Sequence, residues 1–322
     1  MTPSETRKIT DWAASQAQQP HTLYLSDSSH PEQPAFDAFA SELTRIAPCI
    51  RILPSDRPCR IPGFFIADNI CFSALPLEKE LAPFLEALSY QAHPPTLPDN
   101  VQAQLAQVSH SCHLTLFIAV PCPHCPDMVR SLIPLAIHST NVFLEIIDGS
   151  LFPETAREHQ VMSVPCLILD QDFRWTGHAD LKEILTQAIE RDPSRLSAAT
   201  FRQILEQGDA DWICRQMIQA DTLFKGFMDL LLHPEWSVRL GAMVVVESLA
   251  EEAPPLAARL CPVLVQAFED QTVSVQGDIL YALGEAGDQT TRAWIEHIMP
   301  DLTHPDLMDA AKDALAAIQD RV

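Results

Sequence analysis

The chain has 322 residues, too many for one ordinary hydrophobic core, and this length predicts two or three packed units. Hydrophobic residues make up 47% of it and charged residues 20%, a composition that excludes an intrinsically disordered protein. The formal net charge of -22 repels phosphate groups and anionic lipid headgroups. We therefore expect neither nucleic acid nor a membrane surface as a partner.

The apolar segments and the cysteines indicate the compartment. No apolar run approaches the ~20 residues that a bilayer span needs, and the start MTPSETRKITDW lacks the apolar stretch of a secretory signal. We therefore expect a cytoplasmic protein. Most of the nine cysteines stand singly in apolar segments, as Cys49, Cys71 and Cys261 do, where a reduced thiol packs as a small hydrophobe. Cys122 and Cys125 stand apart as a pair.

The first hundred residues predict alternating strands and helices. Residues 21–27 form a short apolar run typical of a buried strand, and residues 34–48 carry apolar side chains at helical spacing. Three more strands are predicted over residues 49–56, 62–68 and 69–75, and an amphipathic helix over residues 76–90. The predicted order is β-α-β-β-β-α.

The same order returns after the proline-rich segment HPPTLPDN. Strands are predicted over residues 113–120, 141–148, 164–170 and 173–177, and helices over residues 126–139 and 180–190. Short sequence matches occur in the same order in both halves, for example Thr22-Leu23-Tyr24 with Thr115-Leu116-Phe117. A tandem repeat of one fold is the simplest interpretation.

From about Leu196 the strand patterns stop and helical periodicity takes over. A turn, a valine and a buried helix recur at Val238 and Val275, a step of 37 residues, and His304 opens a third, looser copy. This period resembles HEAT repeats, and helical arrays of this kind usually bind proteins. Residues 199–322 contain 20 acidic and 8 basic side chains, which form either ordinary solvated surface or a surface that selects a basic partner.

The sequence Cys122-Pro123-His124-Cys125 has the spacing of a redox-active dithiol. Such a pair exchanges disulfides when the first thiol is exposed and partly ionised and the second can reach the mixed disulfide. Between a predicted strand and a helix starting near Pro126, Cys122 is expected at a helix N-terminus, which favours a thiolate, with Cys125 a turn further in. His124 would stabilise the same thiolate, and Pro123 would stiffen the loop.

Val164-Pro165 precedes a predicted strand about forty residues after the dithiol. Thioredoxin-like proteins place a cis proline there, which exposes the preceding backbone to an extended substrate chain. We therefore expect Pro165 to be cis and Val164 to hold the substrate. Cys166, directly after Pro165, is expected to be a buried strand cysteine rather than a third redox thiol.

Residues 1 to about 195 resemble the N-terminal domain of the flavoprotein subunit of bacterial alkyl hydroperoxide reductase, and more distantly archaeal protein disulfide oxidoreductases. The stretches that carry the resemblance are CPHCPD at 122–127, IDGS at 147–150 and VMSVP at 161–165. In that family two thioredoxin folds fuse, only the second keeps the dithiol, and this dithiol passes electrons from a flavin domain to a peroxiredoxin.

The chain departs from that family in two respects. Helical repeats follow in place of a flavin domain, and there is no GxGxxG phosphate loop, so the electron donor is unknown. The Pro-His dipeptide between the cysteines is found in strongly oxidising thiol oxidases, which leaves the direction of electron transfer open.

The resemblance also implies roles for residues of the first lobe. The family has an acid-base glutamate near the dithiol in a Pro-Leu-x-x-Glu context, and Glu80 matches it and would take the proton of Cys125. Without the resemblance, Glu80 would be interpreted as a solvated helix residue. Ser29 and Glu32 align with the dithiol, so the first lobe is expected to be structural, with Ile61-Pro62 as the remnant of its cis-proline turn.

We therefore predict α/β tandem thioredoxin-like folds at residues 1–98 and 99–195 and an all-α HEAT-like repeat domain at residues 196–322. The predicted protein is a thiol-disulfide oxidoreductase in which Cys122 attacks and Cys125 resolves. It needs no cofactor beyond its disulfide and no metal. Its partners would be a protein disulfide substrate, such as a peroxiredoxin, and an unknown thiol reductant or flavoprotein reductase. Two alternatives are a repeat-domain adaptor or chaperone-like protein with a redox-sensing or idle dithiol, and a zinc-binding module using the two cysteines.

Overall fold

The structure is a computed structural model that describes residues 1–16, 19–57 and 59–321. The chain divides into two compact units, residues 1–191 and residues 192–322. The sequence analysis started the helical part at residue 196, four residues after the chain enters the second unit. Each unit is described by itself.

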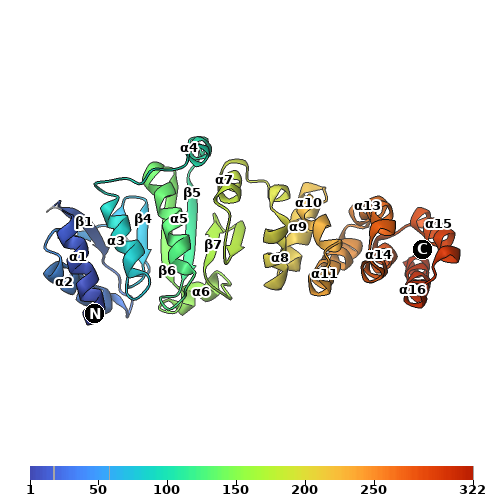
Figure 1. Cartoon of the computed structure of the whole chain (residues 1–322), viewed down its shortest axis with the longest axis horizontal. Coiled ribbons are helices and arrows are strands. Elements are labelled where there is room, and N and C mark those ends of the chain that lie inside the picture. The colour runs from blue at the N-terminus through green and yellow to red at the C-terminus, as the bar shows by residue number, and fades with distance from the viewer. Residues whose placement is uncertain (17–18, 58, 322) are drawn as a thin grey trace. The chain divides into compact units, whose positions relative to one another are not determined.

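Unit 1 is built on one sheet of eight strands in the order β2-β1-β3-β4-β6-β5-β7-β8 (Figure 1). The first lobe contributes β1 (His21–Ser26), β2 (Ile50–Ser55), β3 (Phe64–Ala67) and β4 (Ile70–Ser73). The second lobe contributes β5 (Cys112–Ile118), β6 (Val142–Asp148), β7 (Cys166–Leu169) and β8 (Phe173–Thr176). The lobes join where β4 pairs in parallel with β6, so that no break separates them in the sheet.

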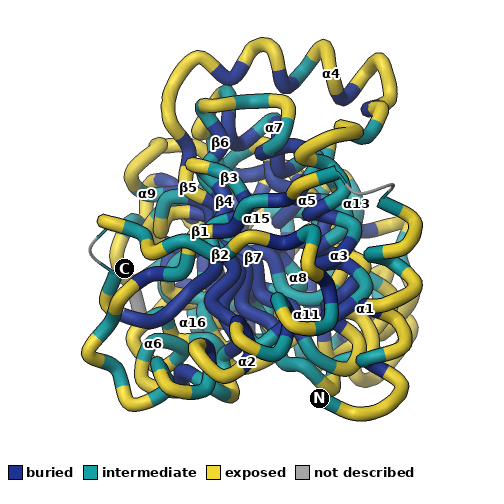
Figure 2. Tube along the Cα trace, turned by 90° about the vertical axis from the view of Figure 1, so that its left-hand side faces the viewer, coloured by how far each residue is buried: buried dark blue, intermediate teal, exposed yellow. Residues whose placement is uncertain are grey.

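The helices of unit 1 include three that the sequence analysis did not predict. The helices of its described residues are α1 (Pro3–Ser15), α2 (Gln33–Ile46), α3 (Leu81–Ser89), α4 (Asp99–Leu105), α5 (Cys125–His138), α6 (Pro153–Glu158) and α7 (Leu181–Glu190). The unpredicted ones are α1, α4 and α6. A capping box, in which the side chains of Thr2 and Glu5 bond to each other's backbone, starts α1. Figure 2 shows the strands as a buried layer, whereas α4 is mostly exposed and buries only Val101 and Leu105.

Most helices of unit 1 pack on one face of the sheet. The ring of Phe64 in β3 lies 5.4 Å from the ring of Phe36 in α2 and 6.1 Å from that of Phe84 in α3, measured between centroids. Helix α5 packs beside α3, and α1 contacts both α2 and α3. On the opposite face, His159 at the end of α6 lies 5.2 Å from the ring of Phe117 in β5. Strand side chains alternate between the faces, so Cys71, Glu145 and Thr115, which are paired neighbours on β4, β6 and β5, share the face of α6.

Val164–Pro165 is cis, as predicted, and it is the one cis peptide bond among the described residues. The prediction of a cis-proline turn at Ile61-Pro62 is therefore wrong. There the chain enters β3 through a turn held by two hydrogen bonds to Ser26. The Gly63 N–H donates to Ser26 Oγ at 2.8 Å, and the Ser26 N–H donates to the Gly63 carbonyl at 3.0 Å.

In its described residues unit 2 contains helices and no strand. The helices are α8 (Ala198–Glu206), α9 (Ala210–Ala220), α10 (Lys225–Leu231), α11 (Trp236–Glu252), α12 (Pro254–Ala257), α13 (Leu260–Ala267), α14 (Val273–Ala286), α15 (Gln289–Ile298) and α16 (Pro305–Arg321). The longest three, α11, α14 and α16, contact one another in sequence, α11 with α14 and α14 with α16.

The buried positions of these three helices recur in register. Each helix buries four side chains at equivalent positions. In α11, α14 and α16 these positions are occupied, in order, by Val238, Val275 and Leu307; Ala242, Ile279 and Ala311; Val245, Ala282 and Ala314; and Leu249, Ala286 and Ile318. Each helix therefore buries the same stripe against its neighbours. The unit is helical, and its classification as a HEAT-like array stays a prediction.

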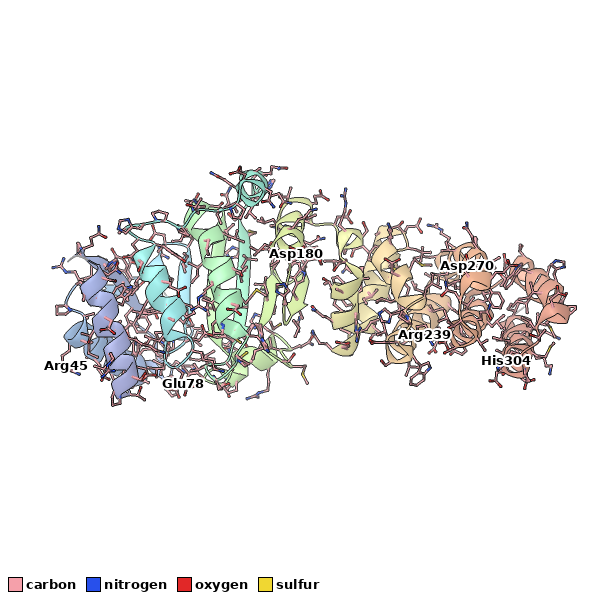
Figure 3. The ribbon with its side chains drawn as sticks, viewed as in Figure 1. Arg45, Glu78, Asp180, Arg239, Asp270 and His304 are labelled. Atoms are coloured by element: carbon pink, nitrogen blue, oxygen red, sulfur yellow. The ribbon has the colours of Figure 1, made fainter. Side chains whose placement is uncertain are left out.

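Arg239 is a buried cation that connects two of these helices (Figure 3). Its Nε donates to Asp278 Oδ2 of α14 at 2.5 Å, and its Nη2 donates to Ser274 Oγ at 2.8 Å. Its Nη1 donates to the carbonyls of His233 and Pro234 at 2.6 and 2.9 Å. The side chain thus holds the turn before α11 and ties α11 to α14.

In the part of the chain that the structure describes, no helix is both long enough and apolar enough to cross a bilayer.

Candidate functional site

The dithiol lies in the loop between β5 and α5. The Cys122 N–H donates to the Ala119 carbonyl at 2.9 Å, and α5 begins at Cys125, with His124 as its N-cap. Cys122 therefore lies three residues ahead of the helix, and Cys125 is the first helical residue instead of lying a turn inside. The turn from Ala119 to Cys122 thus precedes the first hydrogen-bonded residues of α5.

The two thiols differ in access. Cys122 is partly exposed, whereas Cys125 is fully buried, and both are free thiols. Burial raises the pKa of Cys125 most, and the hydrogen bond to Cys122 and the negative charge of Glu80 raise it further. An attacking sulfur that solvent reaches, beside a second sulfur that stays protonated until it is needed, is the arrangement that disulfide exchange requires.

A groove beside Cys122 contains the cis proline. Cys122 Sγ lies 3.9 Å from the carbonyl oxygen of Val164. The groove, of about 570 Å³, is lined by His124, Asp127, Met128, Ser131, Val164, Pro165, Gly177 and His178. Three of the predicted site residues, His124, Val164 and Pro165, therefore line this groove. Cys122 adjoins it through Val164, and Pro123 is exposed but lies outside the lining.

Glu80 is a fully buried carboxyl group. Within the described residues neither of its oxygen atoms has a hydrogen-bond partner. Burial raises the pKa of Glu80 to about 7; the charge of Arg130 acts in the opposite direction, and that of Asp148 adds to the rise. The charge of Glu80 in turn acts on Cys125, so the two groups lie within electrostatic range of each other. The structure thus excludes the solvated position that the isolated sequence pattern would suggest.

The helix that carries Glu80 starts later than predicted. The predicted span was 76–90, whereas α3 begins at Leu81 and Glu80 is its N-cap. In the turn before it, Glu78 has a φ of 50°, and its N–H donates to Glu5 Oε1 at 2.9 Å. This turn folds Glu80 inward, while its neighbours Glu78 and Lys79 stay exposed.

Three further residues of the site escaped the sequence analysis. Arg130 of α5 pairs with Glu86 of α3 through two hydrogen bonds of 2.8 and 3.0 Å, and Lys79 Nζ donates to the Pro121 carbonyl at 3.0 Å. Both contacts hold the first lobe against the dithiol loop. Asp148, buried at the end of β6, acts on Glu80 only through its charge. Arg130 lies five residues beyond Cys125 in the same helix, so its place beside the dithiol could have been read from the sequence.

Neither Cys166 nor a metal-binding cluster adds to this site in the described residues. Cys166 pairs with Phe117 across β5 and β7, so its buried side chain lies on the face of α6, away from α5. Among the described residues no cluster of three or more His, Cys, Asp or Glu side chains has a geometry that would hold a metal ion.

The comparisons with known proteins agree with this fold. Residues 114–190 match the family model of a thioredoxin domain. The crystal structure of a protein disulfide oxidoreductase from Aeropyrum pernix superposes with a TM-score of 0.53 at 15% identity, over 61% of this chain and 95% of that one. The N-terminal part of this chain has a thioredoxin-like fold.

Curated relatives match the same region. An alkyl hydroperoxide reductase subunit of Pseudomonas aeruginosa is 29% identical over 142 residues, which are 42% of this chain and 27% of the relative. An NADH dehydrogenase of Bacillus subtilis is 27% identical over 120 residues, 37% of this chain and 24% of the relative. The thioredoxin-like region therefore resembles part of the reductase subunit, and the chain spans about a quarter of the length of these relatives.

Proposed function

We propose that the protein is a thiol-disulfide oxidoreductase whose Cys122–Cys125 pair exchanges its disulfide with a protein substrate. The observation that supports it best is the buried carboxyl group of Glu80, which has no hydrogen-bond partner among the described residues and lies within electrostatic range of the buried Cys125. Cys122, by contrast, is reached by solvent. A structural cysteine pair has no need of such a carboxyl group, whose burial without hydrogen bonds costs stability.

The reaction with a substrate disulfide balances within these groups. The Cys122 thiolate attacks one substrate sulfur, forms a mixed disulfide and releases the other substrate sulfur as a thiolate. Glu80 accepts the proton of Cys125, and the Cys125 thiolate then attacks Cys122 and releases the second substrate thiolate. Two electrons pass from the dithiol to the substrate, and the reverse sequence oxidises it. A carboxyl group with a pKa of about 7 exchanges protons in both directions near neutral pH.

The groove residues would position the substrate. An extended substrate chain beside Val164 and Pro165 would bring its sulfur to Cys122, since Cys122 Sγ already lies 3.9 Å from the Val164 carbonyl. His124 on the rim of the groove would stabilise the Cys122 thiolate. By the likeness to the alkyl hydroperoxide reductase, the substrate would be a peroxiredoxin-type protein and the electron donor a thiol reductant or flavoprotein, with the reaction in the cytoplasm.

Equilibration with glutathione buffers, followed by thiol trapping and mass spectrometry, tests this function. We expect one disulfide between Cys122 and Cys125, with a potential between about -120 and -270 mV; the lower end would mark a reductant and the upper end an oxidant. Cys125→Ser should accumulate the mixed disulfide on Cys122, and Cys122→Ser should form none. Failure of the two residues to form a disulfide at any potential contradicts the enzyme and favours a repeat-domain adaptor.

A docking strip on unit 2 supports a protein partner. The strip consists of Trp236, Leu240 and Val244 of α11 and Val273 and Tyr281 of α14, all large apolar side chains that are at least 42% exposed. Trp236 and Val273 occupy equivalent positions of the two helices, as do Val244 and Tyr281, each pair 37 residues apart. Repetition of exposed apolar residues at equivalent positions is typical of a binding surface of a helical array, which supports HEAT-like repeats as its framework.

The charge beside the strip favours a basic partner. Tyr281 Oη donates to Glu247 Oε1 at 2.5 Å, and Glu251 and Glu285 continue the strip toward the ends of α11 and α14. The partner of the strip would be a basic amphipathic helix of the substrate protein.

We expect a labelled amphipathic peptide of leucine and lysine to bind the full chain in fluorescence anisotropy titrations. The double change Trp236→Ala and Leu240→Ala should weaken it at least tenfold, because exposed aromatic anchors dominate such contacts. Val263→Ala, which removes an exposed apolar side chain of α13 away from the strip, is the control and should change nothing. Equal binding of a leucine and glutamate peptide would rule out the strip as a basic-helix site.

A further inference from the structure

A pocket lies on the sheet face opposite α3 and α5. In the second lobe α6 covers this face, but in the first lobe the connection from β2 to β3 carries no helix in its described residues. A hollow of about 510 Å³ remains over β3, β4, β6 and β5, bounded by α6 and by the residues before β3. This volume is in the range that small-molecule sites have.

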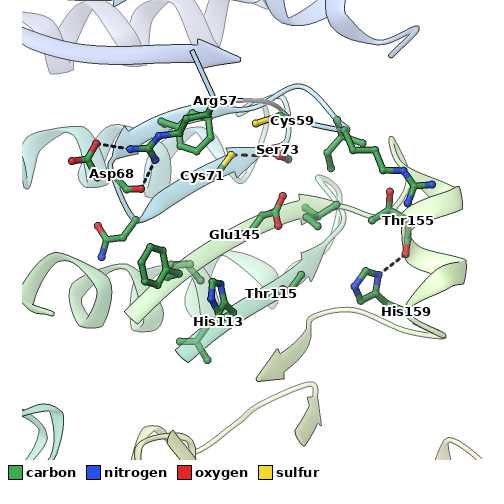
Figure 4. A pocket seen from close by; sticks show the side chains of 18 of the residues that line it. Arg57, Cys59, Asp68, Cys71, Ser73, His113, Thr115, Glu145, Thr155 and His159 are labelled. Atoms are coloured by element: carbon green, nitrogen blue, oxygen red, sulfur yellow. Dashed lines mark hydrogen bonds and ion pairs between the residues drawn. The ribbon is translucent and has the colours of Figure 1, made fainter. Parts of the chain in front are cut away.

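Glu145 of β6 lies at the centre of the pocket floor (Figure 4). Cys71 and Ser73 lie on one side of it and His113 and Thr115 on the other. Burial raises the pKa of Glu145, and the nearby His159 and His113 act in the opposite direction. No hydrogen bond or ion pair of its carboxyl group is found within the described residues, although its oxygen atoms face the pocket.

The cations of the pocket are already paired with other carboxylates. Arg57 pairs with Asp68 at 2.7 Å, and Arg60 pairs with Glu158 at 2.5 Å. The pocket thus holds two guanidinium groups and three carboxylates, of which Glu145 is left unpaired in the described chain. Glu145 is partly buried, and a carboxylate that is partly withdrawn from water without a donor is unfavourable. A ligand that supplies N–H donors and positive charge would remove this cost.

Two aromatic rings give the pocket flat walls. The ring of Phe143 is stacked with that of His113 at 4.9 Å between centroids, and the ring of Phe65 carries the Arg57 guanidinium at 4.8 Å. Flat walls of this kind accept a planar ring, and the rings attract a cation over their faces. The thiols of Cys59 and Cys71 are poor nucleophiles, because burial raises the pKa of both.

We propose that this pocket binds a small planar cation, an aromatic amine or amidine, whose N–H groups pair with Glu145 while its ring lies between Phe65 and Phe143. The proposal is independent of the dithiol, which lies at the start of α5, on the other side of the sheet.

Benzamidine and benzoate are the probes, since they share a planar shape and carry opposite charges. In calorimetric and NMR titrations of the full-length protein we expect benzamidine to bind in the pocket, shifting resonances of Phe143 and Thr115, and benzoate not to bind. Glu145→Gln should weaken benzamidine at least tenfold. Glu154→Gln on α6 removes the same charge outside the pocket lining, and it should leave the affinity unchanged.

Thr115→Val is a second variant that keeps the shape of the strand residue, and it should weaken benzamidine about threefold by removing a hydroxyl group next to Glu145. Three results would each overturn the proposal: no benzamidine binding to the native protein, equal binding to Glu145→Gln and native protein, or equal binding of benzoate. Repeating the titration with Cys122→Ser separates this pocket from the redox site, because the affinity should stay the same.

Discussion

Glu80→Gln is expected to slow disulfide exchange by about 10²-fold or more and to make the folded protein more stable. The rate falls because an amide cannot accept the proton of Cys125, and a positioned acid-base group contributes about 10² to 10⁴. Stopped-flow measurement of exchange with a protein disulfide between pH 5 and 9 should show a dependence near pH 7 in the native protein, from the pKa of Glu80 of about 7, and its loss in the variant. Glu78→Gln, two residues away and exposed, is the control with the same loss of charge.

The Glu80→Gln variant should be more stable than the native protein at neutral and alkaline pH, although its exchange is slower. The folded-state pKa of Glu80 is about 7 and the unfolded value is 4.5, so the folded protein holds this proton more tightly. The resulting stabilisation is fully present below pH 4.5 and is lost as pH rises through 7, an effect on the order of 3 kcal/mol. Urea unfolding at pH 5 and pH 8 should show this loss in the native protein and not in Glu80→Gln. The same pH dependence in both proteins would argue against a buried carboxyl group.

Arg239→Ala is expected to destabilise unit 2 by about 3 kcal/mol. The change leaves Asp278, whose side chain is 25% exposed, without its cation, and it leaves the His233 and Pro234 carbonyls without their donor. Urea unfolding followed by tryptophan fluorescence measures the change in the free energy of unfolding.

Arg259→Ala is the matched control for this prediction. Its ion pair with Asp221 is formed by side chains that are 51% and 74% exposed, and exposed pairs contribute about 0 to 1 kcal/mol. Losses of equal size in the two variants would contradict the role given to burial of Arg239.

The strands of unit 1 and its helices α2, α3, α5 and α7 were predictable because each has its own pattern of apolar residues. Runs of apolar residues whose side chains are mostly buried mark β5 and β6, and apolar residues at helical spacing mark α5. Helix α1 was missed although Thr2 and Glu5 form a capping box, since its mean character is polar. The error at Ile61-Pro62 arose because the duplicated sequence was taken to imply a duplicated backbone, whereas Ser26 and Gly63 hold that turn differently.

The dithiol and the cis proline were predictable from short motifs, but the environment of Glu80 was not. Its burial depends on the turn at Glu78 and on the packing of α3 against α5, which no local pattern encodes. The pocket around Glu145 was missed for a similar reason. Its lining comes from segments between Arg57 and His159 that only the assembled sheet brings together. Arg239 escaped because its partners lie 35 and 39 residues further along the chain.

The pairing of β4 with β6 makes the two lobes dependent on each other for solubility. Each of these strands covers backbone groups of the other, from Ile70 opposite Leu144 to Ser73 opposite Ile147. A second lobe separated from the first would expose β6 as a bare sheet edge of apolar residues, which is a template for intermolecular strand pairing. The first lobe thus covers a strand edge of the second lobe that would otherwise favour aggregation.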